Sequence, residues 1–351
     1  GKAILSGTIA NYHPNDNLIF KIGAPNIVMG TAETLYPTVE SDGSFTINIP
    51  LYHHTQVRMM IGNADLVILL SPEKETNVAI NLSNPPGKQF VFSGQYATIN
   101  NEWCQPELIT KIPPVYSDGD LLDSIVGISA NEFKKRCINQ YKRYVTHNNA
   151  QLQFSEDTRT LANLSCAFDC LENLQATHYC LQTAYQKKEN ITREQAFAAF
   201  LDVYLPDDFH NYLKDFPVNH PLALYCYNYR NVVMDLYDTH KDPLAYEKNL
   251  LKNAPLTKEE QTLIHQYETA FKAGISFQQE SELMALSAKY FKENDQFRWE
   301  SFSKAKERLS NIIQDSTSLI VDYIRAIYMR SSFYNLQPLT PRQELMASEI
   351  T

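Results

Sequence analysis

The stretch Phe92-Ser93-Gly94-Gln95-Tyr96-Ala97-Thr98-Ile99-Asn100-Asn101-Glu102 separates two kinds of sequence. Before it, apolar and polar residues alternate between turn residues, which is the pattern of half-buried strands. After it, apolar residues recur at the three- and four-residue spacing of helices almost to Thr351. We therefore expect an α+β chain, with an N-terminal antiparallel β-sandwich followed by an all-α helical bundle.

The clearest strand signal is the segment Val39–Ile49, which predicts a hairpin. Its Asp42-Gly43 pair supplies a turn with positive φ. The apolar side chains after the turn alternate and so share one face. Further short runs bring the expected total to about seven strands, which favours a sandwich. These runs are residues 4–9, 18–22, 57–61, 66–70, 78–82 and 90–92.

A segment rich in proline and turn residues follows the strands. It contains Pro106, Pro113-Pro114 and Ser117-Asp118-Gly119-Asp120. Such density predicts a linker. The expected domains are a sandwich over 1–94, a linker over 95–120 and a helical domain over 121–351.

Helix starts are marked by Ser or Thr three residues before Glu or Gln, the signature of a capping box. These starts lie at Ser129, Thr192, Thr257 and Thr340, and Asn219 is expected to cap a helix through Pro221. The helix from Thr340 reaches Thr351 without a C-cap glycine or polar tail, so we expect the natural chain to continue.

One long helix is expected from about Glu156 to Tyr185. One of its faces carries mostly large side chains, and the opposite face carries small ones. The small face comprises Ala162, Cys166, Cys170, Asn173, Thr177, Cys180 and Ala184. Small residues at helical spacing allow a neighbouring helix to approach closely, so we expect this helix inside the bundle.

Composition narrows the function classes. The net charge of −9 argues against a nucleic-acid partner, which needs a basic surface. No run of about eighteen apolar residues exists to span a membrane. Gly1 is followed at once by a strand-like segment, as in a mature or cloned start. The missing signal peptide therefore does not indicate a cytosolic address.

The chain has six cysteines, and no two of them have the Cys-x-x-Cys spacing of a thioredoxin-type redox centre. They are too widely spread for a disulfide framework. Cys166 and Cys170 are interpreted as packing residues, because buried free Cys behaves as a small hydrophobe.

In its order of elements the chain resembles the front half of a secreted Bacteroidetes family, the TlpA-like (AhpC/TSA-type) thiol–disulfide oxidoreductases. Asp42-Gly43-Ser44-Phe45 and Phe92-Ser93-Gly94 match motifs of that family, whereas Pro72-Glu73-Lys74 departs from its usual Pro-Gly-Asp turn. The resemblance implies a β-sandwich, a helical region and a C-terminal thioredoxin domain that would carry the chemistry. It also implies a periplasmic or cell-envelope location and a lipoprotein anchor outside this chain.

Other groups of polar residues in the sequence do not predict a catalytic, cofactor-binding or metal site. Adjacent His53 and His54 would face opposite sides of a strand, so we interpret them as a loop or surface pair. Asp118, Asp120 and Asp123 lack the order of an EF-hand loop and suit a helix start. Nucleophile-elbow, phosphate-loop and dinucleotide glycine motifs are absent from the sequence.

Aromatic residues are the one feature with binding potential. Tyr225, Tyr227, Tyr229 and Tyr237 are expected on one helix, which places Tyr225 and Tyr229 on a shared face. The candidate contact residues are Trp103, Tyr225, Tyr229 and Trp299. They are either ordinary core residues or an aromatic groove that grips a polypeptide or glycan.

The leading hypothesis is a non-catalytic accessory region, protein-binding or dimerising, of a periplasmic thioredoxin-like thiol–disulfide oxidoreductase. Its partner would be another protein or its own thioredoxin domain, and a homodimer is possible. The alternative is a free-standing extracytoplasmic glycan- or peptide-binding protein. An enzyme whose site carries no motif is the third reading.

Overall fold

A computed structural model describes residues 1–15, 17–26, 30–105, 107–200, 205, 209–226, 228–237, 244–291, 293–314, 319–334 and 338–349. The chain forms two compact units, each assembled from separate stretches of sequence. Unit 1 comprises Gly1–Ile112, Ile138–Cys170 and His220–Arg230, and unit 2 comprises Pro113–Cys137, Leu171–Asn219 and Asn231–Thr351. These units divide the chain differently from the domains expected from the sequence, which stay a prediction.

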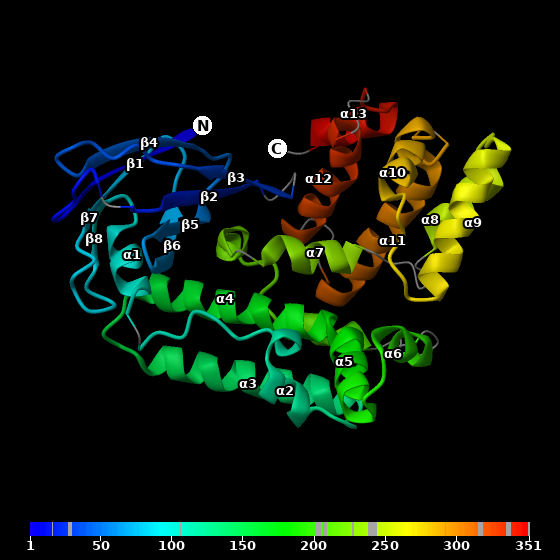
Figure 1. The fold of residues 1–351 in the computed structure, drawn as a ribbon, viewed down its shortest axis with the longest axis horizontal. Helices are drawn as coiled ribbons and strands as arrows, with labels where there is room; N and C mark the ends of the chain where they lie inside the picture. The colour runs from blue at the N-terminus through cyan, green and yellow to red at the C-terminus, as the bar shows by residue number, and fades with distance from the viewer. Residues whose placement is uncertain are drawn as a thin grey trace. The chain divides into compact units, whose positions relative to one another are not determined.

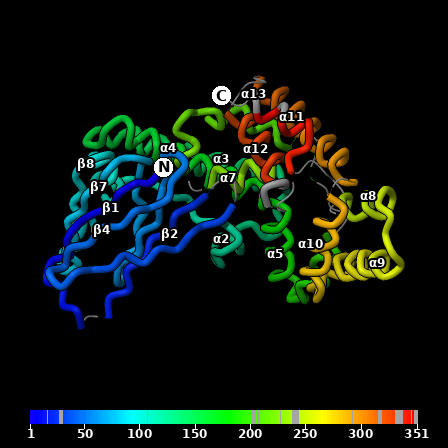
Figure 2. The backbone as a smooth tube through the Cα atoms, turned by 90° about the horizontal axis from the view of Figure 1, so that it is seen from above, coloured from blue at the N-terminus to red at the C-terminus, as the bar shows by residue number. Residues whose placement is uncertain are grey.

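The strands of unit 1 form two four-stranded sheets (Figure 1). Their bounds are β1 Lys2–Ile9, β2 Phe20–Asn26, β3 Thr31–Leu35, β4 Ser44–Pro50, β5 Thr55–Ile61, β6 Ala64–Leu70, β7 Glu75–Ile80 and β8 Phe90–Gly94. One sheet has the order β4-β1-β7-β8 and the other β3-β2-β5-β6. Neighbouring strands are antiparallel except β1 and β7, which run parallel, and β1 and β4 can be followed side by side in Figure 2.

One apolar core joins the two sheets, because alternate residues of both point inward. The first sheet contributes Leu5 and Phe45, and the second contributes Phe20 and Met59. The Phe20 and Phe45 rings meet edge to face, with centroids 4.9 Å apart. The predicted sandwich followed by helices is therefore confirmed.

Two strand predictions need correction. Val39 makes only an isolated bridge to Phe45, so the partner of β4 is β1 and not the segment before the Asp42-Gly43 turn. β3 was missed, because its Thr31-Ala32-Glu33-Thr34 run is exposed and carries no apolar alternation. The turn itself is as expected, with Gly43 at φ 82°.

Helix α1 (Ala97–Trp103) closes one edge of each sheet. Asn100 accepts a hydrogen bond from the Leu69 backbone N–H and donates one to the Leu69 carbonyl, at 2.7 and 3.1 Å. Asn101 does the same to Phe92, at 2.8 and 2.9 Å. Leu69 lies in β6 and Phe92 in β8, the end strands of the two sheets, and Figure 1 shows α1 beside both. Two adjacent amides thus satisfy edge groups that would otherwise be free to pair with another chain.

The remaining helices follow β8 and α1 in the sequence. Their bounds are η1 Val115–Ser117, α2 Gly119–Ser124, α3 Ala130–Ala150, α4 Glu156–Gln175, α5 Thr177–Glu189, α6 Arg193–Phe200, η2 Phe209–Asp215, η3 Pro221–Tyr225, α7 Tyr229–Tyr237, α8 Ala245–Asn253, α9 Lys258–Lys272, α10 Glu280–Lys289, α11 Asp295–Ile313, α12 Leu319–Tyr334 and α13 Pro341–Glu349. No helix in the described ranges is long and apolar enough to cross a membrane.

The helix starts follow local signals closely. The side chains of Thr192, Thr257 and Thr340 each cap their helix, and the Gln or Glu three residues on returns a bond to the capping residue. Ser129 accepts from the backbone N–H of Glu132. Asn219 is not the cap of η3, since His220 at that position accepts from Leu222 N–H through its own Nδ1.

The expected helix over 156–185 is two helices. Ala176 interrupts it between α4 and α5, with φ −74° and ψ 6°. The small face is buried as expected, but an extended segment covers part of it. The Cys166 thiol donates to the Ile109 carbonyl, and Asn173 donates to the Pro113 carbonyl.

That extended segment lies inside the predicted linker. Asn148, which is fully buried, accepts from the Ile109 N–H and donates to the Ile109 carbonyl. The Asp169 carboxylate accepts from the Ile112 N–H, and Asn173 accepts from the Val115 N–H. Side-chain amides and a carboxylate therefore pair with the backbone groups of this segment, in place of the hydrogen bonds that a neighbouring strand would make.

Candidate functional site

Burial disfavours the thiolate form of Cys104, Cys137, Cys166, Cys180 and Cys226. Burial raises the pKa of Cys104 to about 11 and that of Cys137, Cys166 and Cys180 to about 12. Burial also raises the pKa of the Cys226 thiol. Because the thiolate is the nucleophile, these thiols are poor reagents near neutral pH.

The four aromatic residues selected from the sequence lie in different surroundings. Trp103 packs beside the small cluster of Leu108, Phe154 and Ala162. Tyr229 is fully buried, with its ring edge-on to Phe168 at 5.2 Å.

Trp299 belongs to unit 2, where its ring lies 5.4 Å from that of Phe302 and 5.8 Å from that of Tyr328. The Arg342 guanidinium lies 5.1 Å from its centroid. These contacts are those of a packed helix junction between α11, α12 and α13.

Tyr225 and Tyr229 do not share a helix, which corrects the sequence interpretation. Tyr225 ends η3, and Cys226 is extended at φ −76° and ψ 131° before α7 begins. The backbone therefore changes direction between the two tyrosines. Tyr227 lies outside the described residues.

Tyr225 instead joins a group that we call the Tyr–His cluster: His53, His54, Tyr96 and Tyr225. All four side chains are partly buried and belong to unit 1. The histidines lie on the turn between β4 and β5, Tyr96 precedes α1, and Tyr225 ends η3. Three segments far apart in sequence thus bring imidazoles and phenols together.

One hydrogen bond and two ring contacts join the side chains of the cluster. The Tyr96 hydroxyl and His54 Nδ1 form a short hydrogen bond. The His54 ring lies 5.5 Å from Tyr225, tilted by 33°, and 5.9 Å from Tyr96, nearly edge-on. His53 Nδ1 lies 2.6 Å from the His54 carbonyl oxygen.

Burial favours the uncharged forms of two cluster members, Tyr225 and His53. Burial, followed by the charge and the hydrogen bond of Tyr96, raises the pKa of Tyr225 to about 12. Burial lowers the pKa of His53. A phenol with a raised pKa and an imidazole with a lowered pKa both favour their uncharged forms at pH 7.

Sequence reasoning found one member of this cluster and missed the others. Tyr225 was selected for its ring. His53 and His54 were correctly expected in a loop, but the contacts of His54 with Tyr96 and Tyr225 carry no sequence signal. The available signal was Tyr96, a large residue directly after Gly94-Gln95 at a helix start, where a capping residue is usual.

The acidic residues near residue 120 have structural roles. Asp118 caps α2 by accepting from the Asp120 and Leu121 N–H groups. Asp123 pairs with Lys187 at 2.6 Å. Within the described part of the chain no group of three or more His, Cys, Asp or Glu residues is placed to hold a metal ion.

A second set of titratable groups lies in unit 2 around His210. Burial, then the charges of Arg308 and Lys134, lower the pKa of His210 to about 4. Lys134 Nζ also lies over the Phe209 ring, 4.7 Å from its centroid. His210 is therefore a neutral imidazole at neutral pH, in positive surroundings.

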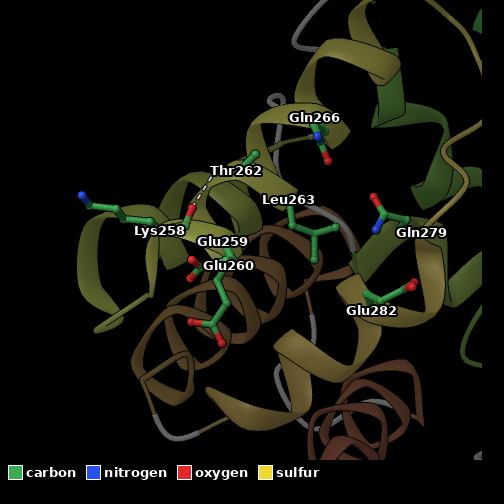
Figure 3. Close-up of a pocket in the computed structure, with 8 residues that line it drawn as sticks. All are labelled: Lys258, Glu259, Glu260, Thr262, Leu263, Gln266, Gln279 and Glu282. Carbon is green, nitrogen blue, oxygen red and sulfur yellow. Dashed lines mark hydrogen bonds between the residues drawn. The ribbon is translucent and has the colours of Figure 1, made fainter.

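A shallow pocket of 440 Å³ lies between α9 and α10 (Figure 3). Leu263, Gln279 and Glu282 lie around its hollow, while the side chain of Lys258 extends away from it. The Glu260 carboxylate accepts from Lys289 Nζ at 2.6 Å and from the Tyr290 hydroxyl at 2.9 Å. That carboxylate therefore holds the two helices together.

Comparisons with known proteins give no further guide to this geometry. No family model, no curated protein and no solved structure matches the chain.

Proposed function

We propose that this chain is a non-catalytic, protein-binding accessory region of a periplasmic thioredoxin-like thiol–disulfide oxidoreductase. The observation that supports this proposal is the state of its thiols, which are buried and have raised pKa values. A redox centre needs the opposite, an accessible thiol with a lowered pKa. The chemistry would then belong to a thioredoxin-like domain, and this chain would bind or position a partner.

The first test is an insulin-reduction assay with dithiothreitol. We expect the chain alone to match the buffer control, while thioredoxin in a parallel reaction turns over. A clear rate that disappears in Cys166→Ala would contradict a non-catalytic role.

The second test reads the coding sequence beyond Thr351. A Cys-x-x-Cys motif after a predicted strand would support the accessory role. A stop codon, or an unrelated domain, would refute the link to a thioredoxin-like domain.

A second candidate function is extracytoplasmic binding of a glycan or peptide. The Tyr–His cluster favours it, because partly exposed phenol and imidazole rings supply contact area together with hydrogen-bonding groups.

A further inference from the structure

Tyr96 breaks two local rules at once. It has φ 59° and ψ 20°, the left-handed region that suits Gly and Asn, and it precedes α1 without a side-chain cap. A large L-residue is strained in this region. An Asn here would relieve the backbone, so what Tyr96 adds is its ring and the hydroxyl that reaches His54.

The hydroxyls and the imidazole of the cluster form a chain of groups that both donate and accept. The Tyr96 hydroxyl is hydrogen-bonded to His54 Nδ1. A hydrogen bond between Tyr96 and Tyr225 contributes to the raised pKa of Tyr225. An imidazole has a hydrogen-bonding nitrogen on each side of its ring, and a phenol hydroxyl both donates and accepts. Hydroxyl groups of a ligand also both donate and accept hydrogen bonds, so they can pair with a donor or with an acceptor of the cluster.

The charge and packing of the cluster exclude other ligand classes. The groups that shift the pKa of Tyr225 and His53 include no carboxylate, lysine or arginine. The His54 ring is tilted against Tyr225 and nearly edge-on to Tyr96, so the ring faces do not form the aromatic cage that favours a cation. The net charge of −9 disfavours an anionic ligand.

We propose that the Tyr–His cluster binds a neutral, hydroxyl-rich ligand of the sugar class, a proposal that rests on the second candidate function above. Sugar rings pair an apolar face, which stacks on aromatic rings, with hydroxyls that donate and accept. Tyr52 supplies a further ring, since its side chain is 75% exposed on the turn that carries His53 and His54.

The test is saturation-transfer NMR on the whole chain, followed by calorimetry for each sugar that responds. The probes are neutral oligosaccharides of glucose, galactose, mannose and xylose, uronic-acid oligosaccharides, and an array of unstructured peptides. We expect saturation transfer to at least one neutral sugar. Tyr225→Phe keeps the ring but removes the hydroxyl, so affinity should fall about 2- to 10-fold. Tyr52→Ala should also weaken binding.

Tyr36→Ala is the matched control, because Tyr36 is 70% exposed but follows β3 and not β4. It should bind as the unchanged chain does. The inference is overturned if no neutral sugar responds, if uronic acids bind more tightly, or if Tyr225→Phe binds equally well. Binding to peptides alone would overturn it and still leave the second candidate function standing.

Discussion

Tyr96 joins a strained backbone to the side chain that reaches His54, so its two contributions to stability have opposite signs. We expect Tyr96→Phe to lower the free energy of unfolding by about 1 kcal/mol, because the bond is lost and the strain stays. Tyr96→Asn should be more stable than Tyr96→Phe, because Asn tolerates the left-handed region better than Phe does. Urea unfolding of the three proteins measures both differences.

The order of the two variants is the informative result. If Tyr96→Asn is the less stable variant, packing of the phenol ring outweighs backbone strain. In that case the strained backbone of Tyr96 gives no support to ligand binding by the Tyr–His cluster.

His210 predicts a dependence of stability on pH. Its pKa in the folded chain is about 4 and its ordinary value is 6.5, so between these values the unfolded chain binds more protons. The contribution of His210 to stability is therefore fully present above pH 6.5 and is lost as pH falls toward 4. Urea unfolding between pH 7 and pH 4 should show this loss, and His210→Gln should reduce it. An unchanged acid slope in His210→Gln would assign the effect to other groups.

At the residue scale the sequence predicts features that depend on near neighbours. Thr192, Thr257 and Thr340 cap their helices because the donors lie within three residues. The His54–Tyr96 and His54–Tyr225 contacts join residues 42 and 171 positions apart, and no local pattern encodes them.

At the scale of elements, α1 is expected to stabilise the sandwich through two residues. Asn100→Ala leaves the buried backbone of Leu69 without its side-chain partner and should cost about 1–3 kcal/mol. Asn101→Ala should cost less, because Asn101 is only partly buried. Thr98→Ala, at an exposed position of the same helix, is the control and should change little.

Thermal unfolding gives the order of the three variants, and hydrogen exchange locates the effect. The Leu69 amide should exchange faster in Asn100→Ala than in Thr98→Ala. Equal exchange in both variants would show that the edge of β6 is protected by other means.

Helices and strands were predicted well where one spacing of apolar residues continues along a long stretch of sequence, and less well elsewhere. β4 and β5 alternate clearly, whereas β3 pairs with β2 without an apolar face to mark it. The break at Ala176 was invisible, because apolar spacing continues through it. There the Thr177 hydroxyl donates to the Leu174 carbonyl, a bond that helical periodicity does not encode.

At the scale of the whole molecule, the buried thiols predict behaviour at high pH. Their pKa values rise from an ordinary 9.0 to about 12 in Cys137, Cys166 and Cys180, so above pH 9 the unfolded chain loses thiol protons first. This contribution to stability is full below pH 9 and is lost as pH rises toward 12. Urea unfolding between pH 8 and pH 10.5 should show the decline.

A triple variant with alanine at Cys137, Cys166 and Cys180 separates thiols from other groups. Its decline above pH 9 should be shallower than that of the unchanged chain. A parallel decline would mean that tyrosines or lysines dominate. In the native chain, Ellman's reagent should label Cys104 first, since it is the least buried of the cysteines.

The order of α-helical and β-sheet regions follows from the sequence, whereas the composition of the compact units does not. Unit 1 combines the sheets with parts of α3 and α4 and with the 220–230 segment. The linker prediction came from proline density, but the burial of Leu108, Ile112 and Val115 depends on side chains of α3 and α4.

The position of Asn100 and Asn101 after the last strand has a consequence for synthesis on the ribosome. All eight strands of the described residues have been synthesised once Gly94 is added. The edges of β6 and β8 nevertheless lack their hydrogen bonds to Asn100 and Asn101 until residue 101 has left the exit tunnel. The nascent sandwich therefore presents two open edges for the time needed to add and expose seven more residues. The nascent chain of a ribosome stalled with Gly94 just outside the tunnel should bind chaperones that recognise unpaired strand edges. The nascent chain of a ribosome stalled after Trp103 has emerged should bind them less.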